Sequence, residues 1–281
     1  MPDRTAARVV SGRARVVREV RAAGPLMARL AAPATARGPW LTAVLNQGAA
    51  RRWSGRPVAV VVDGAPDDPP RAAAFLLVRR RGPLAVVELL GQSAGPLPGG
   101  RPTARLLARD GDAAELLAAG IVQLLGSLRG PVSLRLAGLP LGDPTLRALG
   151  ARLPTAEMAN VRSTRLVDDL DAAGPVERSR DPQVVESLLD RLLDAVPDGR
   201  SRNFLRATTR LHAAIGQLEV AVLEGDRGTL LTLVDGTDRW PWVGTGAGLG
   251  AEMGAPLVGL TLAARPWPSL PWISVPWISP R

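Results

Sequence analysis

Short apolar runs, each closed by glycine, proline or aspartate, dominate the first half of the chain. They are Val58 to Val62, Ala72 to Val78 and Leu84 to Leu90. Runs of this length between turn residues are typical of β-strands. They predict three consecutive antiparallel strands, after which the Pro- and Gly-rich segment 93–102 forms a loop.

Beyond residue 110 the apolar spacing becomes that of helices. Asp112, with Glu115 three residues later, forms a capping-box pattern ahead of leucines at helical spacing. Asp143-Pro144 places a cap and a first-turn proline at the start of another helix. Val132 to Leu136 and Arg162 to Leu170 favour strands, so strands and helices alternate here.

The pattern recurs after segment 171–180, which is rich in Ala, Gly, Pro and charge and which we predict to be a linker. Beyond it we predict helices starting at Asp181-Pro182 and at Ser201, then two strands, Leu218 to Leu223 and Thr229 to Val234. The order predicts an α+β or mixed α/β fold. Its parts are an N-terminal domain (1–170), the linker (171–180), a second domain (181–250) and a Gly- then Pro/Trp-rich tail (251–281).

Composition excludes several chemistries. The 281 residues include one histidine, no cysteine, no tyrosine and no lysine, so all 35 basic residues are arginine. Thiol catalysis, lysine Schiff bases and the usual Cys- or multi-His metal centres are therefore excluded, and we expect no metal. The net charge of +9 favours anionic partners. The alternative is an arginine-rich solvated surface inflated by codon bias.

No apolar run approaches the length of a membrane span, and no secretory segment follows Met1. The first 30 residues superficially resemble an organellar transit peptide, although a domain's own first helix fits them better. We therefore expect a cytoplasmic protein without a transmembrane segment.

Arg202, Arg206 and Arg210 recur every four residues on the second predicted helix of the C-terminal part. Guanidinium groups in such a stripe could bind a phosphate or carboxylate. A solvated helix face is the competing interpretation. His212 lies at the margin of the same helix and could act as a general base, or simply be packed and hydrogen-bonded. Glu88, in a predicted strand, is a second candidate base.

Two further patterns contain no candidate catalytic residue. Residues 246–251 fit a G-x-G-x-x-A fingerprint but follow no clean strand, so we interpret them as a chance match. Residues 266–281 repeat a Pro-Trp unit with a period of five. This Trp/Pro tail could dock on a protein partner or a membrane interface, or be a disordered or altered end of the chain.

The element order from Arg56 to Leu170 resembles the GNAT acyltransferase superfamily, in which a strand meander precedes helix, strand, helix and strand. Within this superfamily the chain resembles CelD/BcsL-type acetyltransferase-like proteins. The stretches that carry this resemblance are Gly55 to Val60, Leu89-Leu90-Gly91, and Arg200 to Arg206 followed by Gly216 and Leu218 to Val222. The resemblance implies a GNAT-like sheet with flanking helices and a second, incomplete GNAT-like half.

The resemblance also implies acetyl-CoA or another acyl-CoA as cofactor, and a small-molecule or polymer acceptor with an amine or hydroxyl. Gln92 and Gly95 stand where the family's coenzyme loop lies, although Pro96 removes one amide donor there; the arginines of the stripe would assist. Without tyrosine, catalysis would need water, Glu88, Glu224 or His212. The alternative is a catalytically inactive GNAT-like protein that binds an anionic or protein partner. Nucleic-acid binding ranks third, because no recognised motif accompanies the charge.

Overall fold

The protein is described by a computed structural model for residues 6–49, 55–66, 68–97, 104–194 and 196–265. The strands are β1 (Arg8–Ser11), β2 (Arg56–Val62), β3 (Ala72–Arg81), β4 (Leu84–Leu89), β5 (Leu107–Ala108), β6 (Val132–Pro140), β7 (Glu157–Asp168), β8 (Val176–Ser179), β9 (Leu218–Leu223), β10 (Gly228–Asp235), β11 (Asp238–Gly246) and β12 (Leu249–Arg265). The helices are α1 (Arg13–Ala22), α2 (Gly24–Arg29), α3 (Gly38–Ala49), α4 (Gly111–Ser127), α5 (Pro144–Arg152), α6 (Leu170–Ala173), α7 (Pro182–Asp194) and α8 (Gly199–Ala214), with short turns η1 (Ala34–Ala36), η2 (Leu90–Gln92) and η3 (Glu224–Asp226).

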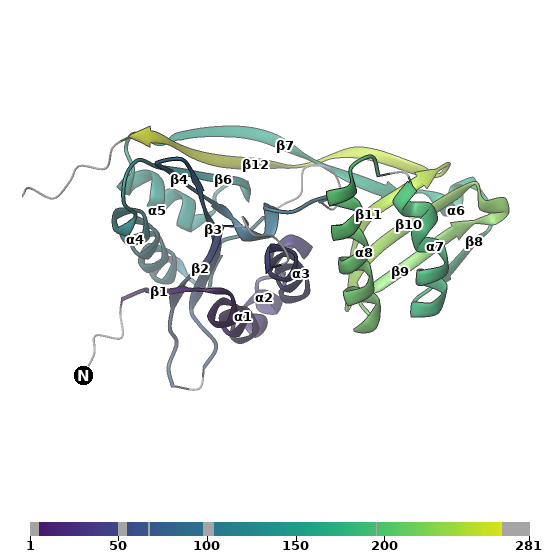
Figure 1. The fold of residues 1–281 in the computed structure, drawn as a ribbon, viewed down its shortest axis with the longest axis horizontal. Helices are drawn as coiled ribbons and strands as arrows, with labels where there is room; N and C mark the ends of the chain where they lie inside the picture. The colour runs from purple at the N-terminus through teal and green to yellow at the C-terminus, as the bar shows by residue number, and fades with distance from the viewer. Residues whose placement is uncertain (1–5, 50–54, 67, 98–103, 195, 266–281) are drawn as a thin grey trace, which may run out of the picture.

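A large mixed sheet forms the N-terminal half (Figure 1). Its strands lie in the order β1-β2-β3-β4-β6-β12-β7, and β5 pairs with β3. All neighbours are antiparallel except β4 and β6, which are parallel. The fold is therefore mixed α/β with flanking helices, as the sequence predicts. Meander, helix, strand, helix and strand follow one another from β2 to β7, which is the order that the GNAT resemblance implies.

Helices cover both faces of this sheet at its central strands, β2 and β3. Side chains alternate along β2, so Val58, Val60 and Val62 pack under α4 and α5 while Ala59 and Val61 face the side of α1 to α3. Strands buried on both faces are apolar throughout, which is why β2 and β3 appear in the sequence as continuous apolar runs.

A smaller sheet forms the second half, in the order β11-β10-β9-β8. Helices α7 and α8 cover one face (Figure 1). The other face packs against Leu166, Leu170 and Leu249, which lie at the far end of β7, at α6 and at the start of β12. The N-terminal half opens with one strand, three helices and three strands, and the second half has one strand, two helices and three strands, so the second half partly repeats this opening.

Strands β7 and β12 form a long antiparallel ribbon that runs across both halves (Figure 1). This corrects two expectations. Residues 251–265, predicted as part of a tail, lie in β12 and fill the position between β6 and β7. Residues 171–180, predicted as a linker, contain part of α6 and all of β8. The division into two domains stays a prediction, and the Trp/Pro tail at 266–281 lies outside the described residues.

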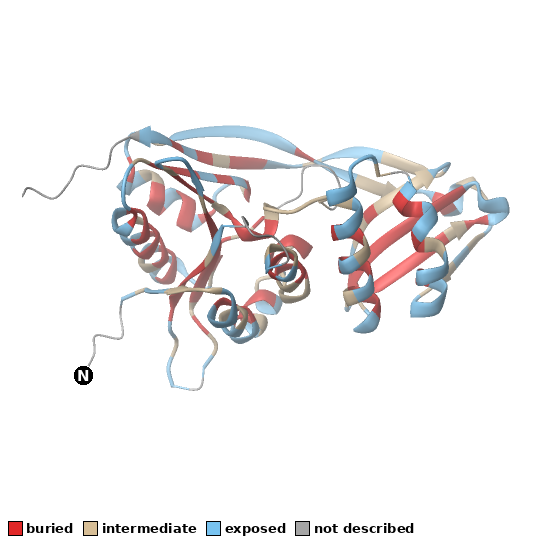
Figure 2. Cartoon of the chain, in the orientation of Figure 1, coloured by how far each residue is buried: buried red, intermediate tan, exposed pale blue. Residues whose placement is uncertain are grey.

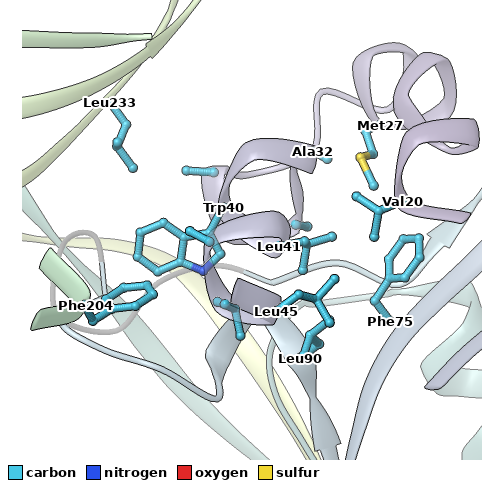
Figure 3. Close-up of a cluster of buried hydrophobic side chains, with 14 of the residues drawn as sticks. Val20, Met27, Ala32, Trp40, Leu41, Leu45, Phe75, Leu90, Phe204 and Leu233 are labelled. Carbon is cyan, nitrogen blue, oxygen red and sulfur yellow. The ribbon is translucent and has the colours of Figure 1, made fainter. Parts of the chain in front are cut away.

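Three aromatic rings join the two halves. Trp40 of α3 meets Phe204 of α8 edge-to-face at 5.3 Å between ring centroids and meets Trp242 of β11 at 5.6 Å. Figure 3 shows Trp40 beside Phe204, with Leu41 and Leu45 continuing the cluster along α3. Edge-to-face aromatic pairs are favourable beyond the area that they bury. The core is therefore continuous from the large sheet into the second half.

Most predicted elements are present with small changes in their bounds, and Asp143 caps α5 as expected by accepting the Leu146 amide. The cap of α4 is a correction: Asp110, not Asp112, accepts the Ala113 amide. Residues 246–251 run from the end of β11 through a turn at 247–248 into β12, so a strand does precede them, contrary to the expectation; because a strand and not a helix follows, the dinucleotide-binding pattern is not met. Among the described residues, no helix combines the length and apolarity needed to cross a membrane.

Candidate functional site

A cavity of about 680 Å³ lies where the two halves meet. Helix α3, the start of β2, the end of β3, the segment after β4 and the beginning of α8 line it. Its apolar lining comes from side chains that are at most 5% exposed, namely Val44, Leu45, Leu77 and Leu90. The cavity therefore has a floor that would accept an apolar group.

Three arginines from separate elements line the same cavity: Arg13 of α1, Arg79 of β3 and Arg200 of α8. Arg13 donates to Asn46 Oδ1 at 2.6 Å, and Arg79 contacts Glu88 at 3.1 Å and the Ser93 carbonyl at 3.0 Å. Arg13 and Arg200 are exposed. Guanidinium groups above an apolar floor suit a ligand that carries a phosphate or carboxylate and an apolar arm.

The gap between the parallel strands β4 and β6 is filled by the chain itself. The two strands pair only as far as Glu88 and Arg135. Beyond that point the amide of Ala104 donates to the Gly138 carbonyl at 2.6 Å, and β5 then continues along β3. Ala104 and Leu106 are buried there. The position between these strands is thus occupied by residues 104–106.

The N-terminus of α4, which follows β5, is also occupied. Asp110 accepts the Ala113 amide at 2.8 Å, and this hydrogen bond lowers the pKa of the Asp110 carboxyl. Asp112 adds a second acidic group in the first turn. Because a helix N-terminus attracts one anion through its free amides, these carboxylates disfavour a phosphate at the same place.

Loop 90–97, the described part of the segment after β4, is held by two indole groups. Trp40 Nε1 donates to the Gly91 carbonyl at 2.6 Å, and Trp242 Nε1 donates to the Pro96 carbonyl at 3.0 Å. Gly95 lines the cavity between the two halves, whereas Gln92 lines a separate crevice of about 20 Å³. The loop thus ties the halves together, and its two predicted cofactor residues lie apart.

The predicted arginine stripe on α8 faces helix α7. Arg206 contacts Asp190 at 2.9 Å, and Arg210 donates through Nε to Glu186 at 2.9 Å. Arg202 is exposed. None of the three lines the cavity between the two halves. Pairing with α7 reduces the charge that Arg206 and Arg210 could offer to a ligand.

The three candidate bases lie in different places. His212 is 4% exposed on α8, with Nδ1 2.9 Å from the Thr208 carbonyl oxygen, and burial lowers its pKa. Glu88 is half-buried on β4 beside Arg79. Glu224 begins η3, the turn between β9 and β10. The structure brings no two of them together, and none lines the cavity.

The sequence does not indicate the three arginines that line the cavity, because they are far apart in the chain. Arg200 lies in one of the stretches that carry the family resemblance, and no local pattern marks Arg13 or Arg79. Among the described residues, no group of three His, Asp or Glu side chains could hold a metal ion.

Comparisons with known proteins give one structural match. No family model and no curated protein matches the chain. A solved structure described as a tandem GNAT protein from the clavulanic acid biosynthesis pathway, without AcCoA, is similar over 92% of this chain and 98% of that chain. The two are 14% identical, with a TM-score of 0.41.

Proposed function

We propose that this protein binds an anionic ligand with an apolar arm, of the acyl-CoA class, in the cavity between its two halves. The observation that carries the proposal is the pairing of a buried apolar floor with the guanidinium groups of Arg13, Arg79 and Arg200. The GNAT-like order of elements and the net charge of +9 support the same ligand class. The likeness to CelD/BcsL-type proteins forms part of this proposal.

The ligand is assigned to the cavity rather than to the gap between β4 and β6. Residues 104–106 fill that gap, and Asp110 caps the helix that follows. Acyl transfer to an amine or hydroxyl would rest on positioning and on water, because His212, Glu88 and Glu224 all lie outside the cavity lining.

Calorimetric titration with acetyl-CoA and a longer acyl-CoA, at low and moderate salt, tests binding. We expect saturable binding that is tighter for the longer acyl chain, because the floor is apolar. Arg200→Ala and Arg13→Ala should each weaken binding about tenfold, or about 1.4 kcal/mol, since each removes a charge-assisted contact. Arg147→Ala is the matched control, because Arg147 is exposed on α5 and does not line the cavity.

Three results would contradict the proposal. They are no binding, binding abolished by moderate salt in the unaltered protein, and equal losses in Arg200→Ala and Arg147→Ala. The last two results would indicate attraction by net charge alone.

The filled gap favours a second candidate, a GNAT-like protein that binds its ligand without transferring the acyl group. Release of free coenzyme A thiol in the presence of amine acceptors separates the two. Because the chain has no cysteine, any thiol detected comes from the coenzyme. Acceptor-dependent thiol release supports transfer, whereas binding without release supports the second candidate.

A further inference from the structure

Strand β7 ends the large sheet and leaves one edge of its backbone without a partner strand among the described residues. Residues 157–162 are all exposed, including Met158 at 59% and Val161 at 40%. Figure 2 shows β7 as exposed along much of its length. The edge of a sheet beside exposed apolar side chains, as at residues 157–162, is a template for pairing with another strand.

Proline and charge, two usual protections of an edge strand, are missing from residues 158–161 at the centre of β7. Its twelve residues include no proline and no glycine, and residues 158–161 carry no charge. The opposite edge of the sheet differs, because β1 has only four residues. Short strands, prolines, bulges and charges are what natural sheets use to block an edge. The centre of β7 is therefore open to a partner.

We propose that two copies of the chain pair antiparallel along β7, with Val161 on the two-fold axis. A two-fold axis perpendicular to the sheet leaves each side chain on the same face in both copies. Residues that lie opposite each other must therefore point to the same face, so one residue lies opposite its own copy at the axis. With Val161 at the centre, Glu157 lies opposite Arg165 of the second copy, twice by symmetry. The two Val161 side chains meet between these charge pairs.

Charge complementarity selects both this register and this partner. Arg165 is 72% exposed and already contacts Glu252 of β12, so its guanidinium lies at the surface of the ribbon. Centring the pairing on Ala159 would instead put the Glu157 carboxylate opposite Val161. Opposite charges directly across two strands stabilise the pairing, and a charge facing an apolar group does not. The β7 sequence is thus complementary to itself.

Single cysteines test the register directly, because the chain has none of its own. Val161→Cys puts two thiols on the axis, and we expect mild oxidation to give a covalent dimer. Ala159→Cys is the matched control, exposed on the same strand and the same face. In this register residue 159 lies opposite residue 163 of the second copy. The two cysteines at 159 would therefore be four positions apart along the strand, about 13 Å at about 3.3 Å per residue, which is too far for a disulfide.

A second variant tests the same interface without crosslinking. Val161→Lys places two like charges on the axis, while the lone chain tolerates lysine at this exposed position. In sedimentation velocity we expect a dimer for the unaltered chain and a monomer for Val161→Lys, with unchanged thermal unfolding of the variant at low concentration. A monomer at every concentration would overturn the proposal and leave the edge for a different partner. A dimer that survives Val161→Lys, or equal crosslinking at 159 and 161, would also overturn it.

Discussion

The only histidine of the chain, His212, is held in its neutral form by the interior of the second half. The side chain is 4% exposed, and burial lowers its pKa from the ordinary value of 6.5. The contact of Nδ1 with the Thr208 carbonyl acts in the opposite direction and is the smaller effect. A proton on Nδ1 completes this hydrogen bond and leaves the imidazole uncharged beside Trp242, 6.5 Å away between ring centroids.

This pKa shift predicts a pH dependence of stability. Below pH 6.5 the unfolded chain takes up a proton that folded His212 resists, so the free energy of unfolding falls as the pH falls from 6.5 toward the folded pKa. Above pH 6.5 this contribution is fully present. Urea unfolding between pH 5 and 8, compared with His212→Gln, measures it. The difference between the two proteins should shrink toward acid, and a constant difference would contradict the prediction.

Sequence periodicity predicts which face of helix α8 carries the arginines and His212, but it does not identify the residues that they contact. The spacing of Arg206 and Arg210 correctly indicates one helix face, but Asp190 and Glu186 become their partners only when α7 packs beside α8. His212 was predicted at the margin of that helix, with packing as one alternative. Trp242, whose ring lies 6.5 Å from the imidazole between centroids, comes from a strand that the sequence does not predict.

Among the elements, helix α5 offers a direct test of a predicted cap. Asp143 is 7% exposed and accepts the Leu146 amide at 2.9 Å. Burial raises the pKa of its carboxyl, so a neutral acceptor of the same shape should serve nearly as well. We expect Asp143→Ala to lower the free energy of unfolding by about 1–2 kcal/mol. We expect Asp143→Asn to cost less, as measured by chemical denaturation; equal losses would contradict the role of the side-chain acceptor.

Strand β12 shows why one element escaped prediction. Gly254, Pro256 and Gly259 interrupt its apolar pattern, and such residues normally signal loops. In the structure a register shift between Met253 and Pro256 accommodates the proline. A Cβ atom at Gly254 would lie 2.3 Å from Ser163 Oγ, so glycine is what allows the two strands of the ribbon to approach. The glycines and the proline that interrupt the apolar pattern of β12 fit its pairing with β7, and sequence periodicity cannot detect that pairing.

Across the whole molecule, the predictable part was the local part. The meander and helices α4 and α5 follow from apolar spacing and cap residues, because their neighbours in the chain are also their neighbours in space. The insertion of β12 between β6 and β7 joins residues about a hundred positions apart. The cavity depends on the same long-range assembly, since Arg13, Arg79 and Arg200 meet only when α8 packs on α3.

The junction itself predicts that the two halves unfold together. Phe204 is fully buried between the halves, edge-to-face with Trp40. Truncating a buried phenylalanine removes its packing and leaves a cavity, so Phe204→Ala should lower the free energy of unfolding by about 3–5 kcal/mol. Ile215→Ala, at a 49% exposed position directly after α8, should change it by about 0.5 kcal/mol or less.

Calorimetry and tryptophan fluorescence together decide between one cooperative unit and two. Because Trp40 belongs to the N-terminal half and Trp242 to the second half, a shared core should give one transition by both methods. Phe204→Ala should move that single transition to lower temperature. If the halves were independent, the variant would destabilise only the second half and a separate early transition would appear. That result would remove the junction as a fixed support for the cavity, since α8 would no longer hold Arg200 against α3.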